Sequence, residues 1–195
     1  MLCLMMFLHL VCVPSSALAF NASPIELENQ SFWSGFVGGI VAHELGHVLV
    51  ASAYGQRAQL NRGSIVYPDS TFSKQELLRV STAGFQTQWL LSEWSFASLH
   101  TENVSSFLDE QHHIGIISSH LAVSFAYAAG LKEYSTSDVY AASQATGRSR
   151  NQLALLALIP ALIDSYRLFG DNVPSWLSKA SMSIKATEIG LIWSF

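Results

Sequence analysis

Residues 32–54 read FWSGFVGGIVAHELGHVLVASAY and carry one formal charge, that of Glu44. An α-helix rises about 1.5 Å per residue, so roughly 20 apolar residues are enough to cross the hydrocarbon of a bilayer. The run is therefore predicted to form a membrane helix with an ionisable side chain near its middle. A charged residue at that depth costs about 2.5–3.5 kcal/mol on insertion scales, so it is rarely present without a function.

Glu44 belongs to the pentapeptide HELGH, residues 43–47, which is an H-E-x-x-H motif. Side chains four positions apart on a helix lie one above the other, so His43 and His47 can reach the same metal ion. Zinc binds imidazole nitrogens at about 2.0–2.1 Å, and the Glu of this motif is placed to act as a general base on water. The motif predicts one Zn²⁺ ion held by His43 and His47, with Glu44 as the catalytic residue. The alternative is a pair of core histidines with a chance Glu between them.

The composition of the whole chain also favours a membrane protein. Of its 195 residues 50% are hydrophobic and only 12% are charged, whereas about 25% are charged in an average soluble domain. Three further windows, residues 80–101, 111–131 and 151–163, contain at most one formal charge each. The histidines and serines of residues 111–131 leave two possibilities for that window, a membrane crossing or a segment at a cavity or interface. The predicted fold class is an all-α polytopic membrane protein with three to five apolar helices around a zinc site.

The N-terminal residues 1–19 form a short apolar run that ends in Ala17-Leu18-Ala19, the small-x-small pattern of a signal-peptidase site. Because no Lys or Arg precedes the run, both a cleaved signal peptide and an uncleaved first membrane helix stay open. Residues 20–195 are expected to form a single membrane-embedded domain. Within it, residues 138–150 are expected to form a polar loop or short surface helix, and residues 175–195 an interfacial or short C-terminal helix.

Loop charges predict how the chain lies in the membrane. Residues 56–79 contain four of the ten Lys and Arg residues, whereas residues 21–31 and 102–110 contain acidic residues and neither Lys nor Arg. By the positive-inside tendency, the loop of residues 56–79 is predicted to be cytoplasmic. Within this loop, residues 58–67 include a β-like segment closed by a Pro-Asp pair. The basic residues are too thinly spread to neutralise a phosphate backbone, so nucleic-acid binding is not expected.

The longer run HELGHVLVASAYG, residues 43–55, resembles the first signature of the site-2 protease family of intramembrane zinc metalloproteases. In that signature Ala and Gly follow the H-E-x-x-H motif at four-residue intervals. The run PALIDSYR, residues 160–167, resembles the second signature of the family, in which a Pro-containing helix provides an Asp as the third zinc ligand. The resemblance implies Asp164 as that ligand. It also implies hydrolysis of a peptide bond in or near a transmembrane segment of a membrane protein substrate, at a site enclosed by the lipid bilayer.

The second signature departs from the family pattern at three positions. Leu156 replaces an Asn that lies eight residues before the Asp, Ser165 replaces the Gly that follows the Asp, and Tyr166 replaces the neighbouring Gly. The run AGFQTQ, residues 83–88, weakly resembles a family stretch on the intervening helix that ends in Asn. Gln88 is therefore predicted to be a substitute substrate-binding or oxyanion donor, with a helix–helix contact as the alternative.

Other residues compete with Asp164 for the place of third ligand. Asp164 and Arg167 are three positions apart, so they could instead form a structural pair on one helix. Glu93 as third ligand would make the site similar to that of a gluzincin. The remaining candidates are the histidines of residues 111–131, namely His112, His113 and His120.

Two other classes of function stay open. A membrane protein with the zinc site but little or no activity would act as a binding or scaffold partner, although the presence of Glu44 favours an enzyme. A luminal gluzincin-like protease using Glu93 would have a soluble core, and the helix of residues 32–54 would then be buried inside it.

Overall fold

The structure is a computed structural model that describes residues 25–61, 64–68, 70–100, 108–170, 173–174, 177, 180–185 and 188–193. The predicted signal peptide or first membrane helix, residues 1–19, lies outside the described residues.

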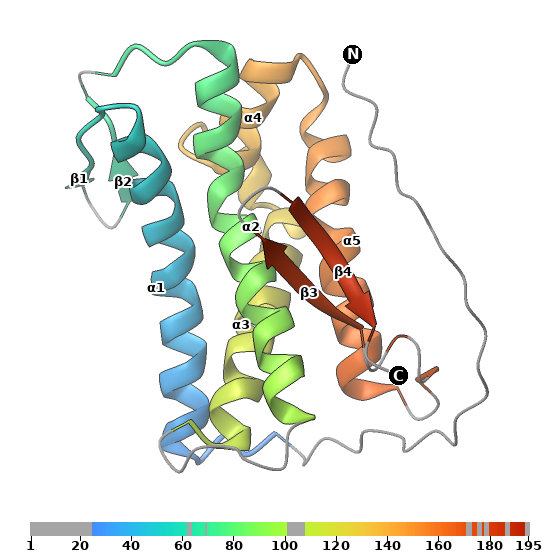
Figure 1. Ribbon diagram of the computed structural model, residues 1–195. Helices are drawn as coiled ribbons and strands as arrows, with labels where there is room; N and C mark the ends of the chain where they lie inside the picture. Colours follow the sequence, from blue (N-terminus) through green and yellow to red (C-terminus); the bar gives the residue numbers. More distant parts are fainter. Residues whose placement is uncertain are drawn as a thin grey trace.

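Four long helices run alongside one another and form the body of the molecule (Figure 1). They are α1 (Gln30–Ala53), α2 (Lys74–Leu99), α3 (Glu110–Ala129) and α5 (Arg150–Phe169). The short helix α4 (Asp138–Thr146) precedes α5 and packs against both α2 and α5. Helix α1 packs against α2 and α3, whereas α5 packs mainly against α3 and α4. The prediction of a mostly helical protein is confirmed.

Polar side chains fix where the helices begin. The side chain of Asn29 accepts a hydrogen bond from the backbone N–H of Ser31 at the start of α1. Ser73 at the start of α2 and Ser149 at the start of α5 each form a capping box with the residue three positions on. Each cap of this kind stabilises a helix by about 1 kcal/mol. The left-handed backbone of Gly147, with φ of 72°, ends α4 and lets the chain turn into α5.

Two hairpins accompany the helices. Strands β1 (Gln59–Asn61) and β2 (Ser64–Val66) pair antiparallel, which confirms the β-like segment predicted after the first helix. Figure 1 shows this hairpin and α4 at the same end of the bundle, the end at which α1 finishes. Strands β3 (Ala180–Lys185) and β4 (Glu188–Trp193) also pair antiparallel, so the helix expected over residues 175–195 is wrong. The alternation of Ser with Met and Ile in β3 fits the period of two that a strand requires.

The outer faces of α1 and α5 are mostly apolar, and the interior of the bundle holds polar as well as apolar side chains. Apart from Glu44, the large exposed side chains between Trp33 and Leu49 of α1 are apolar, and the exposed residues of α5 from Leu155 onward are apolar or aromatic. The buried positions include many histidines, serines and charged residues. Of the helices that the structure describes, α1 and α5 are long and apolar enough to cross a membrane. The polar residues in α2 and α3 lower the hydropathy of the other two predicted windows.

Glycines bring α1 and α3 close together. A Cβ atom at Gly115 of α3 would collide with the backbone of Phe32, and one at Gly35 of α1 would collide with the backbone of His112. Small residues allow this kind of close helix approach, on which packing depends when the surrounding solvent is lipid. The close fit between α1 and α3 fixes how α1 is rotated, and with it the direction in which its histidines point.

Candidate metal centre

His43 and His47 lie one turn apart on α1 and face the interior of the bundle. Both residues are buried, with 3% and 5% of their surface exposed. Their Nε2 atoms are 3.2 Å apart, and the two rings are inclined at 74°. The two nitrogens therefore converge on one point, as the spacing of the motif predicts.

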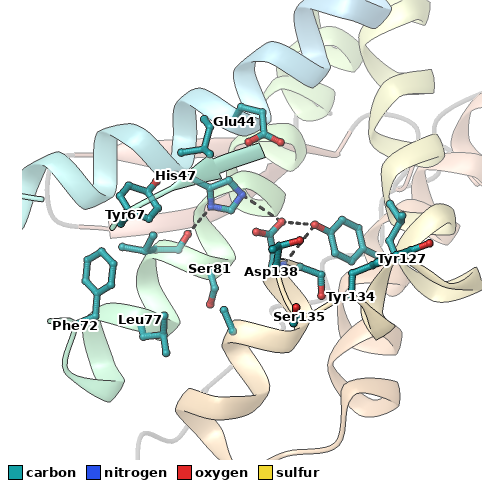
Figure 2. Close-up of a pocket in the computed structure, with 16 residues that line it drawn as sticks. Glu44, His47, Tyr67, Phe72, Leu77, Ser81, Tyr127, Tyr134, Ser135 and Asp138 are labelled. Atoms are coloured by element: carbon teal, nitrogen blue, oxygen red, sulfur yellow. Dashed lines mark hydrogen bonds and ion pairs between the residues drawn. The ribbon is translucent and has the colours of Figure 1, made fainter. Parts of the chain in front are cut away.

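The third member of the group is Asp138, the first residue of α4. Its Oδ2 atom lies 3.1 Å from Nε2 of His43 and 3.3 Å from Nε2 of His47. Figure 2 shows the Asp138 carboxylate facing the His47 ring across the gap between α4 and α1. The group is buried and brings together two imidazoles and a carboxylate that can hold one metal ion.

The spacing of the three ligand atoms matches a tetrahedral ion. Bonds of about 2.0–2.1 Å at the tetrahedral angle put neighbouring ligand atoms about 3.3 Å apart. The three separations in the group are 3.1, 3.2 and 3.3 Å. The three atoms thus form one nearly equilateral face of a tetrahedron around the place where an ion would lie. The fourth coordination position would remain open for a small molecule.

Hydrogen bonds outside the group hold each imidazole in one orientation. The Nδ1–H of His43 donates to Oε1 of Gln88 at 3.0 Å, and the Nδ1–H of His47 donates to the carbonyl of Val80 at 2.6 Å. With the proton on Nδ1, the lone pair of each Nε2 atom points towards Asp138. Acceptors of this kind behind a histidine fix its tautomer and increase its strength as a metal ligand.

Asp138 has a supporting contact of its own and is held as a carboxylate. The hydroxyl of Tyr127 donates to Oδ2 of Asp138 at 2.7 Å. Burial acts to raise the pKa of Asp138, but the hydrogen bonds and positive charge that His43 and His47 supply when they are protonated outweigh it and hold that pKa well below its usual range. A carboxylate in this state is ready to bind a cation.

Gly84 of α2 makes room for the histidine pair. A Cβ atom at this position would lie less than 3.0 Å from the imidazoles of both His43 and His47. The two rings are already bonded at Nδ1, so they cannot turn away without losing those bonds. Only a glycine therefore allows α2 to pack this closely behind the metal-binding group.

A cavity of about 460 Å³ opens beside the group (Figure 2). Glu44, His47, Tyr127 and Asp138 all line it, so the residue between the two histidines borders the same space as the ligands. Tyr67, which follows β2, is a further part of the wall, and burial with the charges of Glu44 and Asp138 raises its pKa to about 12. The site therefore combines a group that can hold a metal, the carboxylate of Glu44 and room for a ligand.

The predicted third ligand, Asp164, lies elsewhere in the bundle. Its carboxylate accepts a hydrogen bond from Oγ of Ser92 at 2.6 Å and lies 3.0 Å from Nδ1 of His120. Arg167 donates to the other oxygen at 3.2 Å, so the structural pairing on one helix is present. The position of α5 explains the difference from the prediction, since α5 packs mainly on α3 and α4 while α1 packs on α2 and α3.

The remaining predicted candidates are also held outside the metal-binding group. Glu93 bonds to Arg167 at 2.5 Å. His112 lies 2.8 Å from Oγ of Ser34, and His113 lies 3.3 Å from Oγ of Ser95. Gln88, predicted to contact substrate, is instead the acceptor behind His43.

The sequence interpretation missed Asp138 and Tyr127. One signal for Asp138 was present, because it is the only charged residue between Glu133 and Arg148. It also follows Ser137, whose side chain accepts a hydrogen bond from the backbone N–H of Tyr140 and caps α4. An acidic residue in a first helical turn is nevertheless common, since it interacts favourably with the helix dipole.

In comparisons with known proteins, the chain matches no protein-family model, no curated protein and no solved structure. A function is therefore assigned from the geometry of this site.

Proposed function

We propose that this protein is a zinc-dependent intramembrane endopeptidase that hydrolyses a peptide bond in or near a transmembrane segment of another protein. The zinc ion is held by His43, His47 and Asp138, and Glu44 is the general base. The observation that carries the proposal is the nearly equilateral triangle of ligand atoms with Glu44 on the wall of the adjoining cavity.

The donor set fits zinc. Catalytic zinc is commonly held by three protein ligands and keeps a fourth position open, and two histidines with a carboxylate are a known set. The same donors also occur around non-haem Fe(II). Glu44 favours zinc hydrolysis, because a carboxylate between the two histidines has a direct use as a base there.

The residues around the ion have separate tasks in peptide hydrolysis. When bound, the ion supplies a Lewis acid for the attacking water and the scissile carbonyl. Glu44 accepts the proton of the water and later donates it to the leaving amine. Val80, Gln88 and Tyr127 keep the three ligands in place, so that little rearrangement is needed during the reaction.

The distribution of polar groups supports a site within a membrane. Apart from Glu44, the large exposed side chains in the middle of α1 are apolar, as are those of α5 from Leu155 onward, whereas His43, His47, Asp164 and Arg167 of these two helices are buried. In the proposed arrangement α1, α2, α3 and α5 all cross the bilayer, with residues 56–79 in the cytoplasm. His47 is six positions before Ala53, the last residue of α1, which places it about 9 Å from that end of the helix.

The proposed substrate is a membrane helix that has locally unwound. A regular helix hides its carbonyls in hydrogen bonds between residues four apart, so a protease cannot reach them until the helix opens. The 460 Å³ cavity at the end of the bundle gives water and an opened segment a route to Glu44 and the ligands.

A second candidate function is a zinc-binding scaffold with little or no activity. The observation that favours it is the position of Gln88, because Gln88 bonds to His43 and is not among the residues that line the 460 Å³ cavity, where an oxyanion donor would be needed. The luminal protease that uses Glu93 has less support, since Glu93 bonds to Arg167 and the exposed face of α1 is apolar.

The test of the proposal uses protein purified in detergent and a panel of single-span membrane substrates. We expect cleavage by the parent, loss of cleavage on chelation and recovery with Zn²⁺. Glu44→Gln should retain zinc but lower the rate by at least about 100-fold, as expected on removal of a general base. Cleavage that Glu44→Gln leaves unchanged would overturn the assignment, and zinc binding without cleavage in the parent would favour the scaffold.

A further inference from the structure

A second cavity, of about 330 Å³, lies between α2, α4 and α5. Its volume is at the lower end of the range of about 300–1,000 Å³ that is typical of small ligand pockets. Most of its wall is apolar, with contributions from Phe85, Trp89, Val139, Leu153, Leu156 and Pro160. Asp138 lines this cavity as well as the first one, so the two spaces meet at a residue of the metal-binding group.

The two cavities differ in chemical character. The first is bordered by Glu44, Tyr127 and a run of hydroxyl side chains at residues 135–137. The second is bordered mainly by aliphatic and aromatic side chains. A polypeptide with its scissile bond at Asp138 would thus have a polar space on one side and an apolar space on the other.

Pro160 leaves a backbone acceptor of α5 without its helical partner, at a residue that lines the apolar cavity. Proline has no N–H, so the carbonyl of Leu156, four positions earlier, lacks its usual partner within α5. Both residues line the cavity. A carbonyl in apolar surroundings is costly unless it accepts a hydrogen bond, and the N–H groups of an unwound helix need acceptors for the same reason.

We infer that the apolar cavity receives a large apolar side chain of the substrate, beside the bond that is cleaved, and that the Leu156 carbonyl accepts a backbone N–H of the same segment. The inference rests on the proposed function and specifies the substrate class, an unwound membrane segment with a large apolar residue next to the scissile bond. A lipid acyl chain fits the apolar wall less well as occupant, because it has no N–H to offer Leu156 and no reason to lie beside Asp138.

The first experiment reduces the volume of the cavity. Ala157 of α5 lines the cavity, so Ala157→Leu fills part of the proposed site. Ala122 of α3 is exposed and lines neither cavity, so Ala122→Leu makes the same change outside the site and is the matched control. Two substrates would differ at one position beside the scissile bond, with Phe in one and Ala in the other. We expect Ala157→Leu to lower kcat/KM for the Phe substrate by about 10-fold or more and for the Ala substrate by less than about twofold. Ala122→Leu should change neither.

The second experiment measures occupancy without catalysis. Glu44→Gln protein, with the cavity intact, is irradiated with a substrate that carries p-benzoylphenylalanine in place of the Phe. We expect adducts on residues that line the apolar cavity, above all Phe85, Trp89 and Leu156. Competition by excess Phe substrate should remove them, and competition by the Ala substrate should not.

The outcomes separate this inference from the proposed function. Equal loss of both substrates in Ala157→Leu, or adducts only outside the cavity, would overturn the inference while zinc-dependent cleavage stands. Labelling of the cavity by a photoreactive phospholipid that excess substrate does not displace would also overturn it. Cavity adducts on Glu44→Gln, together with a parent protein that cleaves neither substrate, would support the binding site and contradict the proposed protease.

Discussion

The Oδ2 atom of Asp138 lies 3.1 Å from Nε2 of His43, although the two residues are 95 positions apart in the chain. This contact brings the start of a nine-residue helix against the middle of the long apolar helix α1. It places Asp138, and not the Asp164 that the family resemblance implies, in the group that can hold a metal ion, so the two aspartates are expected to behave differently on substitution.

Substitution of the two aspartates should separate metal binding from stability. Asp138→Ala removes one of three ligands, so we expect loss of stoichiometric zinc, measured by inductively coupled plasma mass spectrometry after dialysis. Asp164→Asn should retain zinc, because Asp164 contacts His120, Ser92 and Arg167 instead. It should lower the free energy of unfolding by about 3–5 kcal/mol, the usual cost of breaking a buried ion pair. The reverse pattern of zinc contents would restore Asp164 as the ligand.

Addition of one methyl group at Gly84 should disrupt the metal centre. The new Cβ atom would collide with the imidazoles of both His43 and His47, so we expect Gly84→Ala to lose at least about 90% of its zinc. Gly38→Ala is the matched control, because a Cβ atom at Gly38 meets nothing within 4 Å and Ala favours the helix by about 1 kcal/mol. Full zinc content in Gly84→Ala would show that the rings are not packed against α2 as described.

Removal of the Tyr127 hydroxyl should weaken metal binding without unfolding the protein. Tyr127→Phe deletes the donor to Asp138, and loss of such an outer contact typically lowers metal affinity about 10–100-fold. A competition titration with a zinc-binding dye measures the change. Tyr140→Phe keeps the ring that lies under Arg150 and should leave the affinity unchanged. An equal zinc affinity in Tyr127→Phe and the parent would show that the Tyr127 hydroxyl does not help to hold Asp138 in place.

The membrane arrangement predicts that alkaline carbonate does not extract the protein from membranes, whereas detergent does. It also predicts that a cysteine placed at Arg57, in a variant whose Cys3 and Cys12 are changed to Ser, reacts with an impermeant maleimide only from the cytoplasmic side. The reasons are the apolar outer faces of α1 and α5 and the positive charge of residues 56–79. Release by carbonate alone would instead support a soluble core.

The parts of the fold and site that the sequence predicted depend on local geometry. His43 and His47 meet because residues four apart on any helix share a face, and the long apolar run of residues 32–54 already predicted a helix there. A β-like segment was predicted from the pattern of residues 58–67, and the structure shows it as the paired strands β1 and β2. These features need only the chain within about ten residues of the position concerned.

The parts that the sequence did not predict depend on packing between distant segments. Asp138 was assigned to a polar loop or surface helix, and the helix is present, but its first residue is turned inward by the packing of α4 against α2. Asp164 lies in the sequence pattern expected of the third ligand, but its position on α5 places its carboxylate against His120 and Arg167. Gln88 was predicted to contact substrate, but the packing of α2 against α1 places its Oε1 atom within hydrogen-bonding distance of Nδ1 of His43.

The most direct measurement of the central claim is a zinc-edge anomalous map from crystals of the zinc-loaded protein. The account predicts one ion about 2.0–2.2 Å from Nε2 of His43, Nε2 of His47 and a carboxylate oxygen of Asp138. An ion bonded to Asp164, or a fully loaded protein in which Asp138 lies outside bonding distance of the zinc, would contradict it.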